Sequence, residues 1–188
     1  MLENIFPIIF SYLIGSIPFS FIVAKLRRVD LRKRVGNGQI GAAAVKRNCG
    51  LFPAILAGTG DFSKGTLAVF IAKKLVHQDW IIILSGLAVI FGHNWSIFLK
   101  FWGGKGGLVS MGVLFYLLTL PFLLTSLYLV TPFFIIKKKE IFRIPKTSFF
   151  NHLGYLSITI FSFIFNFSFT LAILPILCSL VIILKKNY

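Results

Sequence analysis

Residues 92–107, GHNWSIFLKFWGGKGG, place a lysine inside a cluster of glycines where an apolar segment ends. Glycine lets the backbone fold tightly enough to expose successive N–H groups, which form an anion-binding concavity, and Lys105 adds a full positive charge beside them. This pattern favours a phosphate-bearing ligand at a membrane surface. A flexible hairpin whose lysine reaches out of the membrane is the other interpretation of the same residues.

The composition around this stretch indicates an integral membrane protein. Hydrophobic residues make up 57% of the chain, charged residues only 13%, and the mean hydropathy is +0.89. A formal net charge of +15 is also found in nucleic-acid binders. Here, however, the basic residues form short clusters between long apolar runs, which is the pattern of a protein whose partner is membrane lipid. We therefore expect no nucleic-acid partner.

The apolar segments predict an all-α bundle of about seven membrane spans in a single domain, residues 1–188. Residues 5–24 are expected to be a retained first span, because no basic residue precedes them and no small-residue cleavage site stands out. Residues 108–136 are too long for one upright helix and short for two, and Pro121 divides them into a short or incomplete helical hairpin. The expected segments are 5–25, 51–72, 80–99, 108–120, 121–136, 148–165 and 167–184.

The positions of the charges support the count of seven. With seven crossings, 17 of the 20 basic residues fall on one face, whereas Glu3 and Asp79 fall on the other. Cytoplasmic loops carry the excess of lysine and arginine, so we expect the N-terminus outside and the C-terminus in the cytoplasm.

A second glycine-rich basic loop, RRVDLRKRVGNGQIGAAAVKRN (27–48), lies on the same predicted face. It again offers exposed backbone N–H groups and polar side chains, and its arginine can form paired bonds to a phosphate. A plain loop between two membrane helices, with basic residues serving only topology, is the alternative. If the two loops meet, they can enclose an anionic substrate. The candidate residues in this loop are Gly36, Asn37, Gly38, Gln39, Gly41 and Arg47.

Three further polar residues lie within apolar segments. Asp61 and Lys64 are three residues apart and share a face if the segment is helical. Charges at that depth face a polar cavity or each other, so they are either part of a site or a structural ion pair. His93 is either a general base or a helix-packing hydrogen bonder. The cysteines and histidines are too scattered to predict a metal site.

Several ordered motifs together resemble the bacterial acyl-phosphate-dependent glycerol-3-phosphate acyltransferases, a family of small seven-span membrane enzymes. The resemblance covers about residues 12–121. It rests on YLIGSIPFSFIVAKL (12–26), VGNGQIGA (35–42) with Arg47, DFSKG (61–65), GHNWSIFLKFWGGKGG (92–107) and the following GVLFYLLTLP (112–121).

This resemblance implies transfer of an acyl group from acyl phosphate to the 1-hydroxyl of glycerol 3-phosphate, giving lysophosphatidic acid for phospholipid synthesis at the cytoplasmic face of the bacterial inner membrane. Arg47 is then expected to hold the glycerol phosphate, and Lys105 matches the lysine of the family's GGKG loop. With His93 they form the expected catalytic set, and neither a metal nor a cofactor is expected. The expected substrate-binding residues are Gly36, Asn37, Gly38, Gln39, Gly41, Asp61, Lys64, Gly103, Gly104 and Gly106.

The chain departs from the family pattern at identifiable positions. Ala43 and Ala44 replace a threonine and an asparagine of the first loop, and their side chains cannot hydrogen-bond. The family's C-terminal histidine and asparagine have no counterpart after ILKKNY (183–188). These departures keep a second hypothesis open, an inactive or repurposed homologue that binds lipid or phosphate ligands. A small anion transporter ranks last, because the opposite face offers few cations.

Overall fold

A computed structural model describes residues 2–34, 40–135 and 148–186. Within these ranges the regular secondary structure is helical, apart from one isolated bridge between Ser96 and Trp102. The all-α expectation is therefore confirmed. The elements are α1 Leu2–Ser16, α2 Phe19–Leu26, α3 Leu31–Arg34, α4 Ala42–Cys49, α5 Leu51–Leu75, α6 Asp79–Asn94, the 3₁₀ helix η1 Ile97–Leu99, α7 Gly107–Leu117, α8 Thr119–Ile135, α9 Ser148–Ile164, α10 Phe169–Ala172 and α11 Leu174–Lys186.

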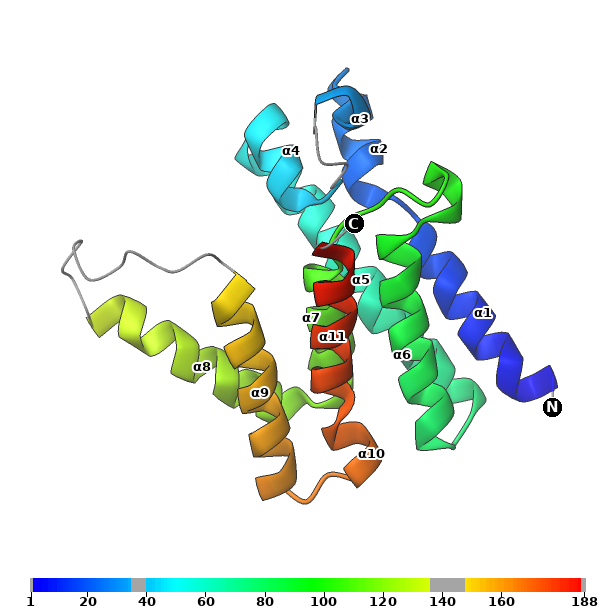
Figure 1. The fold of residues 1–188 in the computed structure, drawn as a ribbon, viewed down its shortest axis with the longest axis vertical. Helices are drawn as coiled ribbons and strands as arrows, with labels where there is room; N and C mark the ends of the chain where they lie inside the picture. The colour runs from blue at the N-terminus through cyan, green and yellow to red at the C-terminus, as the bar shows by residue number, and fades with distance from the viewer. Residues whose placement is uncertain (1, 35–39, 136–147, 187–188) are drawn as a thin grey trace.

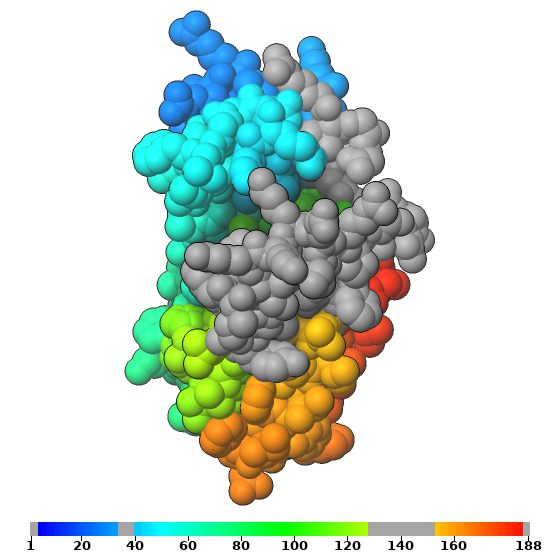
Figure 2. Space-filling model, turned by 90° about the vertical axis from the view of Figure 1, so that its left-hand side faces the viewer, coloured from blue at the N-terminus to red at the C-terminus, as the bar shows by residue number. Residues whose placement is uncertain are grey.

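The helices form an elongated bundle with a cap at one end. α5, α6, α7 and α11 run through its middle, α1 packs on α5 and α6 at one flank, and α8 and α9 lie at the opposite flank (Figure 1). α2, α3 and α4 form the cap, with the loop that precedes α7 beside it. Seen from the flank of α8 and α9, the cap occupies one end and the turn after α9 the other (Figure 2). The N-terminus lies far from the cap, so the cap is separated from it by the length of α1.

Two hydrophobic cores hold these parts. The larger one joins α5, α6, α7, α9 and α11 and includes Ile81, Ile90 and Leu114. A smaller one lies inside the cap, where Val45 of α4 packs with Leu31 and also with Leu99 of η1. The smaller core therefore fixes α4 beside the loop after α6, although about 50 residues separate them.

Glycines allow two pairs of helices to approach closely. A β-carbon on Gly92 of α6 would collide with the backbone of α1, and one on Gly112 of α7 would collide with the backbone of α5. Small residues serve this purpose in membrane bundles, where van der Waals packing between helices provides much of the attraction. The α1–α6 contact is the one that matters for the site, because it places His93 beside the end of α1.

The first apolar segment is one long stretch but not one helix. α1 ends at Ser16 and α2 begins at Phe19, so the first span, which was predicted over 5–24, is interrupted at Ile17 and Pro18. Pro18 has no N–H to donate and disfavours helical geometry at Ile17, which accounts for the break. The break leaves carbonyls at the end of α1 to be satisfied by other groups.

A second apolar segment is also divided. The region 108–136 is split at Leu118, and Pro121 lies in the first turn of α8, where a proline costs no hydrogen bond. Among the described residues, Asn4–Leu26 alone is long and apolar enough to cross a membrane by itself, and four further apolar helices are shorter, at 10–17 residues. The count of about seven spans therefore stays a prediction.

Candidate active site

The two glycine loops meet. The backbone N–H of Ile40, in the first loop, donates to the carbonyl of Gly103 in the second at 3.1 Å. The N–H of Gly104 donates in turn to the carbonyl of His93 at 3.2 Å, which ties the second loop to the end of α6. Segments far apart in the sequence therefore form one continuous backbone surface.

A cleft of about 340 Å³ opens beside this junction. We call it the cationic cleft, because Arg47 and Lys105 both line it and both are exposed. Within the described residues neither cation has an ion pair or a hydrogen bond. Their charges are thus available to an anionic ligand. The lining residues are Gly41, Ala42, Ala43, Ala44, Arg47, Asp61, His93, Gly104, Lys105, Gly106, Gly107 and Leu108.

Two helices begin at the cationic cleft. α4 begins at Ala42 and α7 at Gly107, and the first residues of both line it. The first N–H groups of a helix have no partner within the helix, and they carry the positive end of its dipole. Helix N-termini are therefore suited to phosphate. Ala43 and Ala44 line the cleft without contributing a polar side chain, and the N–H of Ala44 donates to the carbonyl of Gly41 at 2.9 Å.

The second loop needs glycine at two positions for different reasons. Gly106 has φ +79°, in the left-handed region that favours glycine. At Gly104 the constraint is space, because a β-carbon would collide with Nε2 of His93 and approach the carbonyl of Ile40. His93 thus packs directly under the glycine loop.

Asp61 holds the opposite side of the His93 ring. Its Oδ1 lies 3.4 Å from Nδ1 of His93, and its Oδ2 accepts a hydrogen bond of 3.1 Å from Ser20 of α2. With Nδ1 facing the carboxylate, Nε2 is the atom that faces the loop and the cationic cleft. Carboxylates commonly fix the tautomer of an imidazole in this way.

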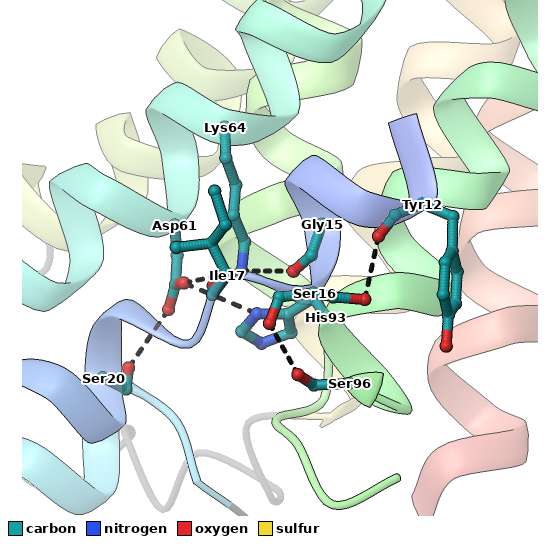
Figure 3. A network of polar contacts seen from close by, with 9 residues as sticks. All are labelled: Tyr12, Gly15, Ser16, Ile17, Ser20, Asp61, Lys64, His93 and Ser96. Atoms are coloured by element: carbon teal, nitrogen blue, oxygen red, sulfur yellow. Dashed lines mark hydrogen bonds and ion pairs between the residues drawn. The ribbon is translucent and has the colours of Figure 1, made fainter. Parts of the chain in front are cut away.

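Lys64 points away from the cationic cleft, into the break between α1 and α2 (Figure 3). Its Nζ donates to the carbonyls of Gly15 at 2.7 Å and Ile17 at 2.8 Å, and it lies 3.2 Å from Oδ1 of Asp61. Two of the three hydrogens of the ammonium are therefore donated to carbonyls, and the contact with Asp61 is an ion pair. The expected ion pair between Asp61 and Lys64 is therefore present, and Lys64 does not share the cleft with Arg47 and Lys105.

Sequence reasoning missed two serines of this network. Ser20 binds Asp61, and Ser96 donates to the carbonyl of Ser16 at 2.5 Å (Figure 3). A lone serine in an apolar segment carries no signal by itself. By contrast, the run of three alanines after Gly41 is a helix-forming signal that could have located the N-terminus of α4.

The structure places the remaining predicted residues as follows. Gly41 precedes α4, and Gly103, Gly104 and Gly106 form the second loop, with Gly103 tied to Ile40. Gly36, Asn37, Gly38 and Gln39 lie outside the described residues.

One protein-family model matches almost the whole chain. Residues 5–187 match the model described as glycerol-3-phosphate acyltransferase. The chain belongs to this family. The predicted resemblance is confirmed, and it extends through the C-terminal helices, beyond the region that the motifs had covered.

Curated relatives bear the same description. The glycerol-3-phosphate acyltransferase of Thermus thermophilus is 41% identical over 117 residues, 62% of this chain, and that of Aquifex aeolicus is 42% identical over 115 residues, 61% of this chain. The matched part spans 58% and 59% of those relatives' own lengths.

Two solved structures of a family member share the fold. The crystal structure of PlsY (YgiH), an integral membrane glycerol 3-phosphate acyltransferase, in its glycerol 3-phosphate form superposes with a TM-score of 0.81 at 31% identity. It covers 98% of this chain and 88% of that chain. The lysophosphatidic acid form of the same protein gives a TM-score of 0.80 at 30% identity, with the same coverage.

Proposed function

We propose that this chain transfers an acyl group from an acyl phosphate to the 1-hydroxyl of glycerol 3-phosphate, forming lysophosphatidic acid and releasing phosphate. The observation that carries this proposal is the cationic cleft, where two helix N-termini and two cations without a partner in the described part of the chain face one space. Two phosphate-bearing substrates need two sources of positive charge. Family membership supports the choice of substrates.

Arg47 is the group that we assign to the phosphate of glycerol 3-phosphate. Its guanidinium is planar and binds phosphate oxygens in pairs, which fixes the direction of the glycerol as well as its affinity. Arg47 lies on α4, whose N-terminus also lines the cationic cleft. Gly36, Asn37, Gly38 and Gln39 remain predicted contacts of the same phosphate.

Lys105 and the N-terminus of α7 are assigned to the acyl phosphate. Negative charge develops on the carbonyl oxygen and on the departing phosphate during the transfer, so fixed donors aimed at them lower the barrier. The N–H groups of Gly106 and Gly107 lie next to Lys105 in the chain and line the same cleft.

His93 is assigned as the general base. Nε2 accepts the proton of the 1-hydroxyl while the oxygen attacks the acyl carbon, the bond from that carbon to the phosphate oxygen breaks, and the proton then passes to the phosphate. Asp61 keeps the imidazole in the required orientation through Nδ1. A buried carboxylate is unsuited to bind an anionic substrate directly, so we assign Asp61 to this supporting part.

We further propose a multi-pass protein of the bacterial inner membrane whose cationic cleft opens at the cytoplasmic face. Asp79 supports this placement, because it lies at the end of the bundle far from the cap and binds Ser168 at 2.7 Å. Most described basic residues belong to the cap and to the loop before α7, as the positive-inside rule requires of the cytoplasmic side, whereas Lys73 and Lys74 lie at the far end of α5 as exceptions.

The test uses the full chain, purified in detergent or lipid nanodiscs, with palmitoyl phosphate and glycerol 3-phosphate. We expect release of inorganic phosphate together with equimolar lysophosphatidic acid, measured by mass spectrometry. R47A and K105A should abolish most of this activity, whereas K46A, which removes an exposed cation next to Arg47 on the same helix, should retain it. Binding of glycerol 3-phosphate without product would instead indicate a non-catalytic binding protein.

A further inference from the structure

The break between α1 and α2 is bound by side chains from two other parts of the bundle. Three consecutive carbonyls, those of Gly15, Ser16 and Ile17, each accept a hydrogen bond from outside α1. Lys64 of α5 supplies two of these bonds and Ser96 supplies the third. The end of α1 is therefore held by two side chains that do not line the cationic cleft.

The charges of this cluster balance internally. Lys64 is 3% exposed and Asp61 is 2% exposed, so neither charge is stabilised by hydration. The carbonyl end of a helix carries partial negative charge, and the lysine therefore faces both the end of α1 and a carboxylate. A buried charge that loses its partner is strongly unfavourable, so the two residues depend on each other.

Asp61 connects this cluster to the cationic cleft. The same atom, Oδ1, lies near both Nζ of Lys64 and Nδ1 of His93. Ser20, in the first turn of α2, holds the other oxygen. The position of the carboxylate, and through it the orientation of the imidazole, is thus set from the helix break (Figure 3).

We propose that Lys64 is a positioning residue: it clamps the broken end of α1 and fixes the Asp61 carboxylate, and thereby holds His93 with Nε2 toward the cationic cleft. The inference rests on the function proposed above. Lys64 does not touch the substrates in this scheme, which distinguishes it from Arg47 and Lys105. A purely structural lysine would instead matter only for folding.

The decisive variant is the double substitution K64M/D61N. Each single substitution leaves one buried charge unpaired and is expected to reduce folded protein, whereas the double variant removes both charges together. We expect it to purify in higher yield than either single variant, although the carbonyls of Gly15 and Ile17 lose their donor in it. Its kcat should fall roughly 100-fold, as is seen when a reacting group is slightly misplaced, with the KM for glycerol 3-phosphate changed less than about threefold because the phosphate contacts remain. K74M, an exposed lysine on the same helix, is the matched control.

Histidine spectra give a readout that does not depend on turnover. In ¹⁵N-histidine NMR of the wild type, the signal removed by H93Q should show one tautomer, protonated at Nδ1. In K64M/D61N the same signal should show both tautomers. K64R, which keeps the charge and the donors, should retain the single tautomer and part of the kcat.

The outcomes separate the two proposals. A wild type that forms no product contradicts the proposed function, and the tautomer measurement then decides the inference alone. A folded K64M/D61N variant with wild-type kcat, or with an unchanged His93 tautomer, overturns the positioning role. So does a double variant whose loss lies entirely in KM.

Discussion

Lys64 and Lys105 are both lysines near one site, yet their surroundings are opposite. Lys64 is buried and makes two hydrogen bonds and an ion pair within the protein, whereas Lys105 is exposed and, like Arg47, has no partner among the described residues. Burial makes a charge expensive unless the protein supplies all of its partners. Exposure keeps a charge hydrated and free to exchange water for a ligand. Under the proposed function, Lys64 supports the site, whereas Lys105 and Arg47 bind substrate.

The largest effect that tests this comparison concerns stability. K64M on its own leaves Asp61 buried with one partner fewer and two carbonyls without donors, so we expect the free energy of unfolding to fall by about 3–5 kcal/mol. K105M should change it by less than about 0.5 kcal/mol, because an exposed cation makes no contact that folding requires. Thermal unfolding in detergent, followed by circular dichroism, measures both. Equal losses for the two variants would remove the distinction between them.

Ligand affinity should show the reverse order. K105M and R47M each remove a charged donor, so we expect the affinity for glycerol 3-phosphate or acyl phosphate to weaken by about 1.5–3 kcal/mol. The double variant K64M/D61N should keep its affinity within about threefold, since it leaves the cationic cleft in place. Isothermal titration calorimetry provides the measurement. K100N is the control for K105M, because Lys100 lies in the same loop at φ +56° and asparagine tolerates this conformation.

A glycine substitution tests the contact between the second glycine loop, which carries Lys105, and His93, which lies next to Asp61. In G104A the new β-carbon meets Nε2 of His93 and the carbonyl of Ile40, and overpacking of this kind costs about 1–3 kcal/mol of stability. G41A places its β-carbon in open space, at a backbone conformation that alanine adopts readily, and should cost only a few tenths of a kcal/mol. Unfolding temperatures compare the two. A G41A variant as unstable as G104A would mean that the loops are packed differently.

The smallest effect is expected at Ser20. S20A removes one hydrogen bond to Asp61 while Lys64 still pairs with the carboxylate, so a loss of about 1 kcal/mol is expected. S63A, on the exposed side of α5, is the control and should be neutral. A loss at Ser20 larger than that of K64M would show that the serine, rather than the lysine, holds the carboxylate.

The sequence alone predicted those parts of the molecule that depend on local patterns of residues. Apolar runs predicted the helices, and clustered glycines with a nearby cation predicted the two loops that border the cationic cleft. The spacing of Asp61 and Lys64 predicted that they share a helix face, and they do form an ion pair. These features follow from the periodicity of a helix and from the chemistry of glycine.

The direction in which Lys64 points could not be predicted in this way. Whether a buried lysine faces a ligand or a helix end is decided by contacts with segments far along the chain, such as Gly15. Pro18 marked a possible break in α1, but membrane helices often continue through proline when neighbours satisfy the freed groups. Only the packing of α1 against α5 and α6 settles that the helix is interrupted there.

The ring nitrogen of Pro18 carries no hydrogen. This missing hydrogen bears on the contacts that lead from the end of α1 through Lys64 and Asp61 to His93. A residue with an N–H at position 18 would remove one obstacle to a continuous helix. In a continuous helix the last carbonyls of α1 would accept from backbone N–H groups of the next turn and would turn away from Nζ of Lys64. The ammonium would then be left with the carboxylate alone. Under the proposed function, the orientation of His93 thus depends on an irregularity in a neighbouring helix, and a continuous helix there would lower the activity.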